Sequence, residues 1–154
     1  AARSPPEVVN GGHLTRGALG LILSYHTVLQ RIAADPHEDH VYVVAEDDAV
    51  LHDDFSPRLR SCLDALEQVD PRWDLLHVGY YEDDCSLKAI EGPASEFLCR
   101  PVKVYGLFGA AFRPRGARAL LEQLFPLDEQ IDSALANVYG AVSAYATRPA
   151  LMHA

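Results

Sequence analysis

The sequence has few cysteines, and its histidines form no recognisable metal signature. The three cysteines, Cys62, Cys85 and Cys99, are odd in number and lack Cys-x-x-Cys spacing, which argues against a zinc knuckle or a disulfide-stapled scaffold. Seven histidines are present, but neither H-E-x-x-H nor H-x-E followed by C-x-x-C occurs, so the common zinc hydrolase and deaminase signatures are missing. The spacing leaves open whether Cys85 and Cys99, which bracket a polar segment, form a disulfide in an oxidising compartment.

Basic residues and long hydrophobic runs are also scarce. Lys and Arg number 13 against 22 Asp and Glu, which gives a formal net charge of −9. Because binding to a phosphate backbone depends on cationic side chains that release counterions, we expect no nucleic-acid partner. The longest strongly apolar stretch, residues 17–25, is too short to cross a bilayer, so we expect no transmembrane segment. No signal-peptide pattern opens the chain, because charged residues and prolines interrupt its first seven positions.

The remaining composition is that of an ordinary globular protein. The chain has 154 residues, of which 49% are hydrophobic and 23% charged, and this length suits one domain over residues 1–154 with an irregular lead-in at 1–13. Helical spacing predicts helices over 15–34, 56–69, 114–125 and 129–138, with N-caps at Thr15 and Ser56. Apolar and β-branched runs predict strands over 41–45, 73–79, 97–105, 107–113 and 142–147, and the polar residues 80–96 predict a surface loop.

Helices alternate with strands along this pattern. We therefore expect an α/β fold with a mostly parallel sheet flanked by helices, in which residues 41–45 form a buried parallel strand.

The acidic triplet Glu46-Asp47-Asp48 follows that expected strand directly. Residues at this place lie at the carboxyl edge of the sheet, where open α/β folds bind ligands. Three adjacent carboxylates repel one another, and a divalent cation such as Mg²⁺ or Mn²⁺, which prefers oxygen ligands, relieves that repulsion. The alternative is a solvated acidic turn, since Asp53-Asp54 extends the acidity toward the next helix.

Several segments, taken in order, resemble glycosyltransferase family 25, which holds lipopolysaccharide glycosyltransferases and collagen galactosyltransferases. Residues 14–26 (LTRGALGLILSYH) resemble its L-T-x-G-E-x-G-C-x-x-S-H segment, and residues 43–51 (VVAEDDAVL) are similar to its L-I-L-E-D-D-A-V-L. Further similarities lie at Asp54-Phe55 (D-F), 73–79 (W-D-L-L-x-L-G), 109–121 (G-T-A-Y followed by G-A-x-x-L-L), 126–132 (P-I-D) and Arg148-Pro149.

The resemblance implies a GT-A-like fold and a metal-dependent, inverting glycosyltransferase. Such an enzyme uses Mn²⁺ or Mg²⁺ and moves a hexose, galactose or glucose, from a nucleotide sugar such as a UDP-sugar to a glycan or a hydroxylated protein acceptor. The implied compartment is the cytoplasm for a bacterial or viral member and the endoplasmic reticulum or Golgi lumen for a eukaryotic one.

The resemblance also suggests roles for individual residues. The implied metal ligands are Glu46 and Asp48, with His153 just past the last expected strand as a further candidate, and Asp47 would meet the ribose or sugar hydroxyls. The general base would be Asp132 or Asp128. We favour Asp132, because Asp128 near the helix start is suited to capping whereas an aspartate within a helix is intrinsically unfavourable and answers to another demand.

Ser24, His26 and Gly109 are the remaining candidates for contacts with cofactor or substrate. On a helix, Ser24 and His26 point roughly 200° apart, so both cannot face one ligand, and a structural histidine is the alternative role for His26. Gly109 permits close backbone approach near the acceptor or, alternatively, marks a bulge in an extended segment.

The sequence departs from the family pattern in three places. Ala18 replaces the glutamate after L-T-x-G, Leu21 replaces the cysteine, and Phe112 replaces the tyrosine of G-T-A-Y. Only thirteen residues precede Leu14, where the family carries a strand–helix–strand unit that forms much of the nucleotide pocket. These departures keep a second function open, a non-catalytic GT-A-like domain that binds a sugar or a protein without a complete donor pocket.

Overall fold

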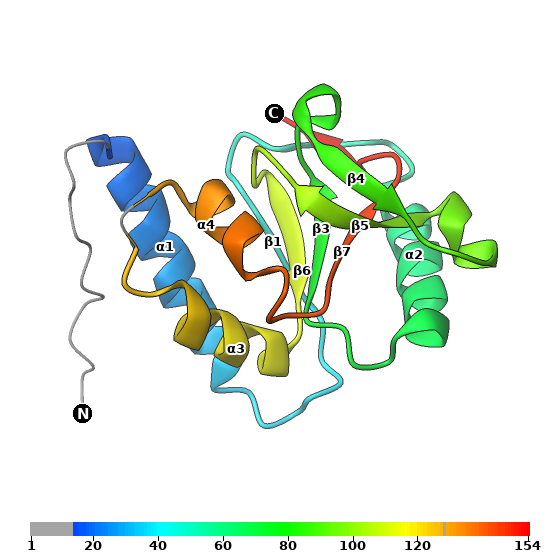
Figure 1. Ribbon diagram of the computed structural model, residues 1–154, viewed down its shortest axis with the longest axis horizontal. Coiled ribbons are helices and arrows are strands. Elements are labelled where there is room, and N and C mark those ends of the chain that lie inside the picture. The colour runs from blue at the N-terminus through cyan, green and yellow to red at the C-terminus, as the bar shows by residue number, and fades with distance from the viewer. Residues whose placement is uncertain (1–13, 128) are drawn as a thin grey trace.

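The computed structural model describes residues 14–127 and 129–154, so the lead-in expected over residues 1–13 lies outside the described part. The chain forms a mixed α/β fold in which helices flank an open sheet (Figure 1). The helices are α1 (Arg16–Ala33), α2 (Phe55–Val69), α3 (Pro114–Leu124) and α4 (Ile131–Val138), with short 3₁₀ helices at Glu82–Asp84 and Pro93–Glu96. The strands are β1 (Tyr42–Ala45), β2 (Val50–Leu51), β3 (Leu75–Gly79), β4 (Ser86–Ala89), β5 (Leu98–Lys103), β6 (Gly109–Phe112), β7 (Ala144–Thr147) and β8 (Met152–His153).

The sheet has the strand order β1-β6-β3-β7-β5-β4, and most of its neighbouring strands are antiparallel. Only β3 runs parallel to its neighbours β7 and β8 within the described residues, while β8 also pairs antiparallel with β2. The prediction of a mostly parallel sheet is therefore wrong. The alternation of helices and strands indicates the α/β class. However, β6 lies between β1 and β3 and runs opposite to both, and no local sequence pattern indicates this arrangement.

Strand β1 lies at an edge of the sheet rather than in its interior. Within the described residues it pairs only with β6, through the register Tyr42↔Phe112 to Ala45↔Gly109. Its residues alternate between half-buried and exposed, and Val43 is 43% exposed. The expectation of a buried parallel strand at 41–45 is wrong, because a continuous apolar run does not distinguish a central strand from an edge strand whose outer face is only partly covered.

Most element boundaries agree with the sequence pattern, with local exceptions. Thr15 caps α1 as predicted, since its Oγ1 accepts a hydrogen bond from the Ala18 N–H at 3.1 Å. Helix α2 begins at Phe55 with Asp54 in the N-cap position, so the prediction of Ser56 as N-cap is wrong by two residues. The segment 80–96, expected to be a loop, contains β4, which pairs with β5. All three cysteines are free thiols.

The core lies on both faces of the sheet because successive residues of a strand point to opposite sides. On β3, Leu75 packs with α1, α3 and α4, whereas the next residue, Leu76, packs with α2. Figure 1 shows the three helices gathered on one side of the sheet and α2 on the other. Among the described residues, no helix has the length and apolar character needed to cross a bilayer.

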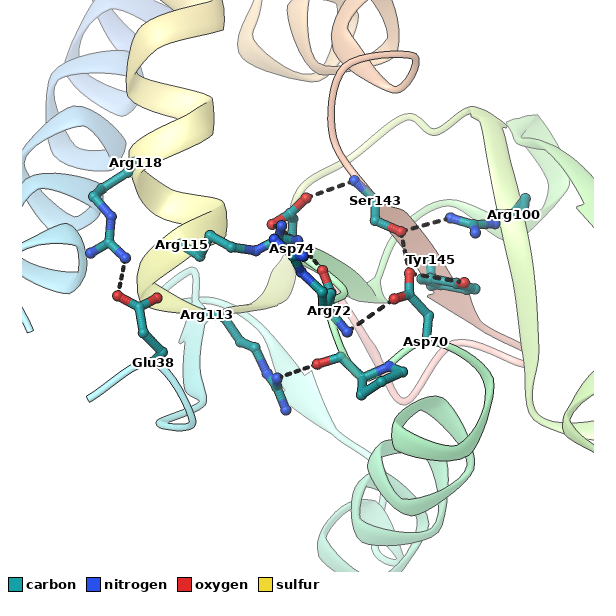
Figure 2. Close-up of polar contacts among 11 residues, drawn as sticks. Glu38, Asp70, Arg72, Asp74, Arg100, Arg113, Arg115, Arg118, Ser143 and Tyr145 are labelled. Atoms are coloured by element: carbon teal, nitrogen blue, oxygen red, sulfur yellow. Dashed lines mark hydrogen bonds and ion pairs between the residues drawn. The ribbon is translucent and has the colours of Figure 1, made fainter. Parts of the chain in front are cut away.

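A polar network holds the end of the sheet where β3 and β7 begin (Figure 2). Asp70 accepts hydrogen bonds from the Arg72 backbone N–H at 3.0 Å and from the Ser143 hydroxyl. Asp74 accepts one from the Ser143 N–H at 2.8 Å and forms an ion pair with Arg115 at 2.7 Å. The network joins the turn before β3 to the turn before β7 and fixes the start of both strands.

Gly116→Ala is expected to lower the free energy of unfolding by about 1–3 kcal/mol, because the added methyl overpacks a tight site. A Cβ at Gly116 would lie 2.1 Å from the Asp74 carbonyl oxygen and 2.7 Å from the Asp74 Cα, so α3 or β3 must move. Urea unfolding measures the change. The matched control is Gly20→Ala in α1, where nothing lies within 4 Å of the added Cβ and roughly 0.5–1 kcal/mol of stabilisation is expected. Equal unfolding midpoints for wild type and Gly116→Ala would show that the contact relaxes without cost.

Candidate functional site

The acidic triplet forms a turn at the end of β1, and the segment before β6 holds it in place. The Glu46 N–H donates a hydrogen bond to the Phe108 carbonyl at 2.9 Å, and the Ala49 N–H donates one to the Glu46 carbonyl at 3.2 Å. Glu46 is half-buried, whereas Asp47 and Asp48 are exposed. The triplet therefore follows the end of a strand as the sequence predicts, although that strand lies at the edge of the sheet.

A cavity of about 280 Å³ opens beside Glu46. It is lined by the beginning of α1, by residues 106–108 and by the beginning of α4, which contributes Gln130, Ile131 and Asp132. Glu46 and Asp132 are far apart in the sequence, yet both carboxylates belong to this one cavity. The predicted metal ligand and the predicted base are thus brought to the same place.

Asp132 is positioned by two backbone groups. Its Oδ1 accepts a hydrogen bond from the Ser133 N–H at 2.8 Å, and its Oδ2 accepts one from the Gly106 N–H at 3.3 Å. Gly106 has a φ of +76°, a left-handed conformation that favours glycine, and a Cβ there would meet the Phe108 ring at 2.7 Å. The Gly106 contact ties the beginning of α4 to the segment that leads into β6, and the Ser133 contact fixes the carboxylate within α4.

The sequence-based prediction that Asp132 lies in the interior of a helix is wrong. Helix α4 begins at Ile131, so Asp132 is its second residue and lies in the first turn. A carboxylate there is stabilised by the positive end of the helix dipole, and the argument from helix propensity for a catalytic role no longer applies. What now distinguishes Asp132 is its position in the cavity. Asp128, the other candidate base, lies outside the described residues.

A second cavity of about 460 Å³ adjoins the first, and the two share Leu21 and Glu46. Ser24 and Tyr25 of α1 line one side, and Asp47 and Asp48 line another. Tyr25 is buried, and its hydroxyl donates a hydrogen bond to the Leu107 carbonyl at 2.9 Å. The sequence analysis missed Tyr25, whose only signal is a tyrosine at an inward position of the first helix.

The four carboxylates around the two cavities repel one another. Burial raises the pKa of Glu46, and the neighbouring charges of Asp48, Asp47 and Asp132 raise it further. Burial, followed by the charge of Glu46, likewise raises the pKa of the Tyr25 hydroxyl. An added anion is therefore unfavourable here, whereas a cation would relieve the repulsion. Carboxylate oxygens are the donors that Mg²⁺ and Mn²⁺ prefer, so this set of residues fits either ion.

Ser24 and His26 lie in different surroundings, as their spacing on the helix predicts. Ser24 is exposed at the second cavity, and its hydroxyl donates a hydrogen bond to the Gly20 carbonyl at 2.9 Å. His26 is half-buried and packs edge-on against Phe125, with ring centroids 4.7 Å apart. The aromatic contact is consistent with the structural alternative for His26.

Gly109 lies in the sheet rather than at either cavity described. It is buried in β6, and a Cβ there would lie 2.1 Å from the Met152 sulfur. Opposite it, the register of β3 shifts between His77 and Gly79, which marks an irregularity at this point of the ladder. Because glycine has no side chain, Met152 packs directly against the Gly109 backbone. The close approach that Gly109 permits is therefore to another part of the chain.

His153 reaches the neighbourhood of the triplet through the pairing of β8 with β2. It lies opposite Val50, two residues after Asp48, and its exposed ring lies 5.3 Å from that of His52. The ligand atoms of Glu46, Asp48 and His153 are not gathered around one point. In the described part of the chain, the only group of three candidate ligands with atoms within 4.8 Å of one another is His37, Asp39 and His40. A metal site at the triplet stays a prediction.

No protein-family model matches the chain, and no curated protein matches it. The function must therefore be argued from the arrangement of the residues themselves.

Proposed function

We propose that the protein is a metal-dependent, inverting glycosyltransferase that moves a hexose from a UDP-sugar to a hydroxyl group of a glycan or glycoprotein acceptor. The observation that carries the proposal is the meeting of Glu46, Asp47, Asp48 and Asp132 at two adjoining cavities. A GT-A-like fold is part of the proposal. It is supported by β1, β3 and β7, which run in one direction, and by the acidic turn that follows β1.

Glu46 and Asp48 are the residues that would hold Mn²⁺ or Mg²⁺. When bound, the ion offsets the negative charge that develops on the diphosphate as the sugar leaves. Asp47 and Ser24 line the second cavity, where their polar atoms can accept hydrogen bonds from ribose or sugar hydroxyls. The buried hydrogen bond from the Tyr25 hydroxyl to the Leu107 carbonyl joins α1 to the segment before β6 beside the two cavities.

Asp132 is the residue that would take the proton from the acceptor hydroxyl. The Ser133 and Gly106 N–H groups each donate to one carboxylate oxygen, which fixes its orientation and leaves lone pairs free on both oxygens. A positioned base of this kind contributes ~10²–10⁴-fold to the rate of a proton-transfer step. Asp132 lines the first cavity, Asp47 and Asp48 line the second, and Glu46 lines both, so the first cavity can hold the acceptor and the second the donor.

Mn²⁺ is expected to raise the melting temperature, because it binds the clustered carboxylates in the folded state only. At 100 times its dissociation constant, the ion should contribute about 2.7 kcal/mol to the free energy of unfolding. Thermal melts with and without Mn²⁺ measure the shift. Asp48→Ala should reduce it strongly, whereas Asp53→Ala, an exposed acidic residue outside both cavities, should leave it unchanged. An identical shift in Asp48→Ala would place the ion elsewhere.

The release of UDP from UDP-galactose and UDP-glucose in excess Mn²⁺ tests the activity itself. Turnover that depends on both Mn²⁺ and an acceptor is the expected result. Mn²⁺-dependent binding of UDP without turnover, measured by calorimetry, would instead support the non-catalytic sugar-binding domain. The absence of both binding and turnover would overturn the proposal.

A further inference from the structure

The turn between α1 and β1 carries a second group of candidate ligands, at the end of these elements opposite to the acidic cavities. Its sequence is Asp35-Pro36-His37-Glu38-Asp39-His40. His37, Asp39 and His40 are exposed, and each offers one ligand atom within 4.8 Å of the others. The two imidazole rings lie with their centroids 4.8 Å apart. Two imidazoles and a carboxylate thus converge on one point at the surface.

Asp35 holds this turn in a defined conformation. Its Oδ1 accepts a hydrogen bond from the His37 N–H at 2.9 Å, and its Oδ2 contacts the His40 Nδ1 at 2.6 Å and accepts a short hydrogen bond from the Tyr42 hydroxyl. The His40 N–H also donates to the His37 carbonyl at 3.1 Å. These contacts join the end of α1 to the first residue of β1 and limit the movement of both histidines.

The contact between Asp35 and His40 also decides which ring nitrogen can bind a metal. A carboxylate beside Nδ1 favours the tautomer with its proton on that nitrogen, which leaves the Nε2 lone pair available. The same carboxylate accepts hydrogen bonds from the Tyr42 hydroxyl and from the His37 N–H, so Asp35 is itself held in place beside His40. Metal-binding histidines commonly have such a carboxylate partner on the second nitrogen, because it orients the ring and makes the ligating nitrogen more basic.

We propose that His37, Asp39 and His40 bind Zn²⁺, with Asp35 as the positioning residue for His40. Two nitrogen ligands and one oxygen ligand suit Zn²⁺ better than Mg²⁺ or Mn²⁺, and three protein ligands leave the fourth tetrahedral position to water. The inference does not rest on the proposed sugar transfer, since none of these residues lines either cavity. A zinc ion here would link the end of α1 to the beginning of β1 and stabilise that connection.

Calorimetric titration of the full chain with ZnCl₂ tests the site. Wild type is expected to bind one equivalent of Zn²⁺ that His37→Ala and His40→Ala each lose, whereas Asp48→Ala retains it. The matched control is Glu38→Ala, because Glu38 belongs to the same turn but its carboxylate forms an ion pair with Arg118 of α3 and takes no part in the cluster (Figure 2). This control should bind Zn²⁺ as wild type does.

Asp35→Asn tests the positioning role separately. It is expected to weaken Zn²⁺ binding by roughly 10–100-fold and to change the visible spectrum of the Co²⁺-substituted protein, because the His40 ring is no longer held by a carboxylate. Thermal melts without metal show whether each variant is folded. No zinc binding by wild type, or equal affinity in wild type and the folded His37→Ala and His40→Ala variants, would overturn the proposal. Equal losses in the folded Glu38→Ala control would overturn it as well.

Discussion

Asp132→Asn is expected to lower the rate of sugar transfer by ~10²–10⁴-fold while UDP and Mn²⁺ still bind. The amide has nearly the shape of the carboxylate but cannot take a proton from the acceptor. Its carbonyl can still accept the hydrogen bond from the Ser133 N–H, whereas the contact between Oδ2 and the Gly106 N–H is lost if the amide nitrogen takes that place. Initial rates with saturating donor and acceptor measure the loss, and calorimetry measures UDP binding in excess Mn²⁺.

The matched control for this variant is Glu129→Gln. Glu129 lies three residues earlier, lines neither cavity and accepts a hydrogen bond from the Asn137 side chain at 2.7 Å, so its replacement should leave transfer unchanged. Asp128→Asn distinguishes the two candidate bases. If transfer survives in Asp132→Asn and is lost in a folded Asp128→Asn variant, Asp128 is the base.

His77 is expected to make the protein less stable as the pH falls below neutrality. The ring lies buried in β3, 1% exposed, and burial lowers its pKa from 6.5 to about 3. Its Nε2 lies 2.9 Å from the Tyr139 hydroxyl, and its Nδ1 has no hydrogen-bond partner in the described part of the chain. A charged ring would therefore carry a buried N–H without an acceptor, so the folded protein keeps His77 neutral.

The direction of the change in stability with pH follows from which state binds the proton. Between pH 6.5 and 3 the unfolded chain takes up a proton at His77 that the folded protein does not, so the stability supplied by this residue is complete above pH 6.5 and falls as the pH falls. At pH 5 the loss from His77 alone is about 2 kcal/mol. Urea unfolding at pH 7.5 and pH 5 measures the total change.

His77→Gln isolates this contribution, because glutamine does not titrate. The variant should be less stable at neutral pH, since it replaces a packed ring, but its stability should fall by about 2 kcal/mol less than that of wild type between the two pH values. Identical pH dependence in wild type and His77→Gln would falsify the assignment.

Local patterns in the sequence predicted most of the helices and strands. The apolar spacing between Thr15 and Ala34 and the capping hydroxyl of Thr15 depend only on residues within a few positions of one another, and α1 forms as they indicate. Strand β3 was found for the same reason, as a short apolar run ended by Gly79. The predicted N-cap of helix α2 lies two residues too late, because Asp54 and Ser56 are both residue types that favour this position and the sequence does not choose between them.

The pairing of strands was not predictable in the same way. An apolar run such as 41–45 indicates a strand, but whether it is central or at an edge depends on which distant segments lie beside it. Strand β6 pairs with both β1 and β3 and runs opposite to each, which makes the sheet mostly antiparallel. That arrangement results from contacts between residues at least 30 positions apart and has no counterpart in local periodicity.

The sequence alone determined the mixed α/β class and placed the acidic triplet directly after a strand, because both follow from residue type and spacing along the chain. Only the tertiary structure decided that Asp132 shares a cavity with Glu46, since this depends on α4 docking against residues 106–108. It also decided that Asp35 orients His40, a contact made when the chain turns back from α1 into β1. Carboxylates and imidazoles act over a few ångströms, so their chemistry is set by the folded chain, whereas the elements that carry them are set by neighbours in sequence.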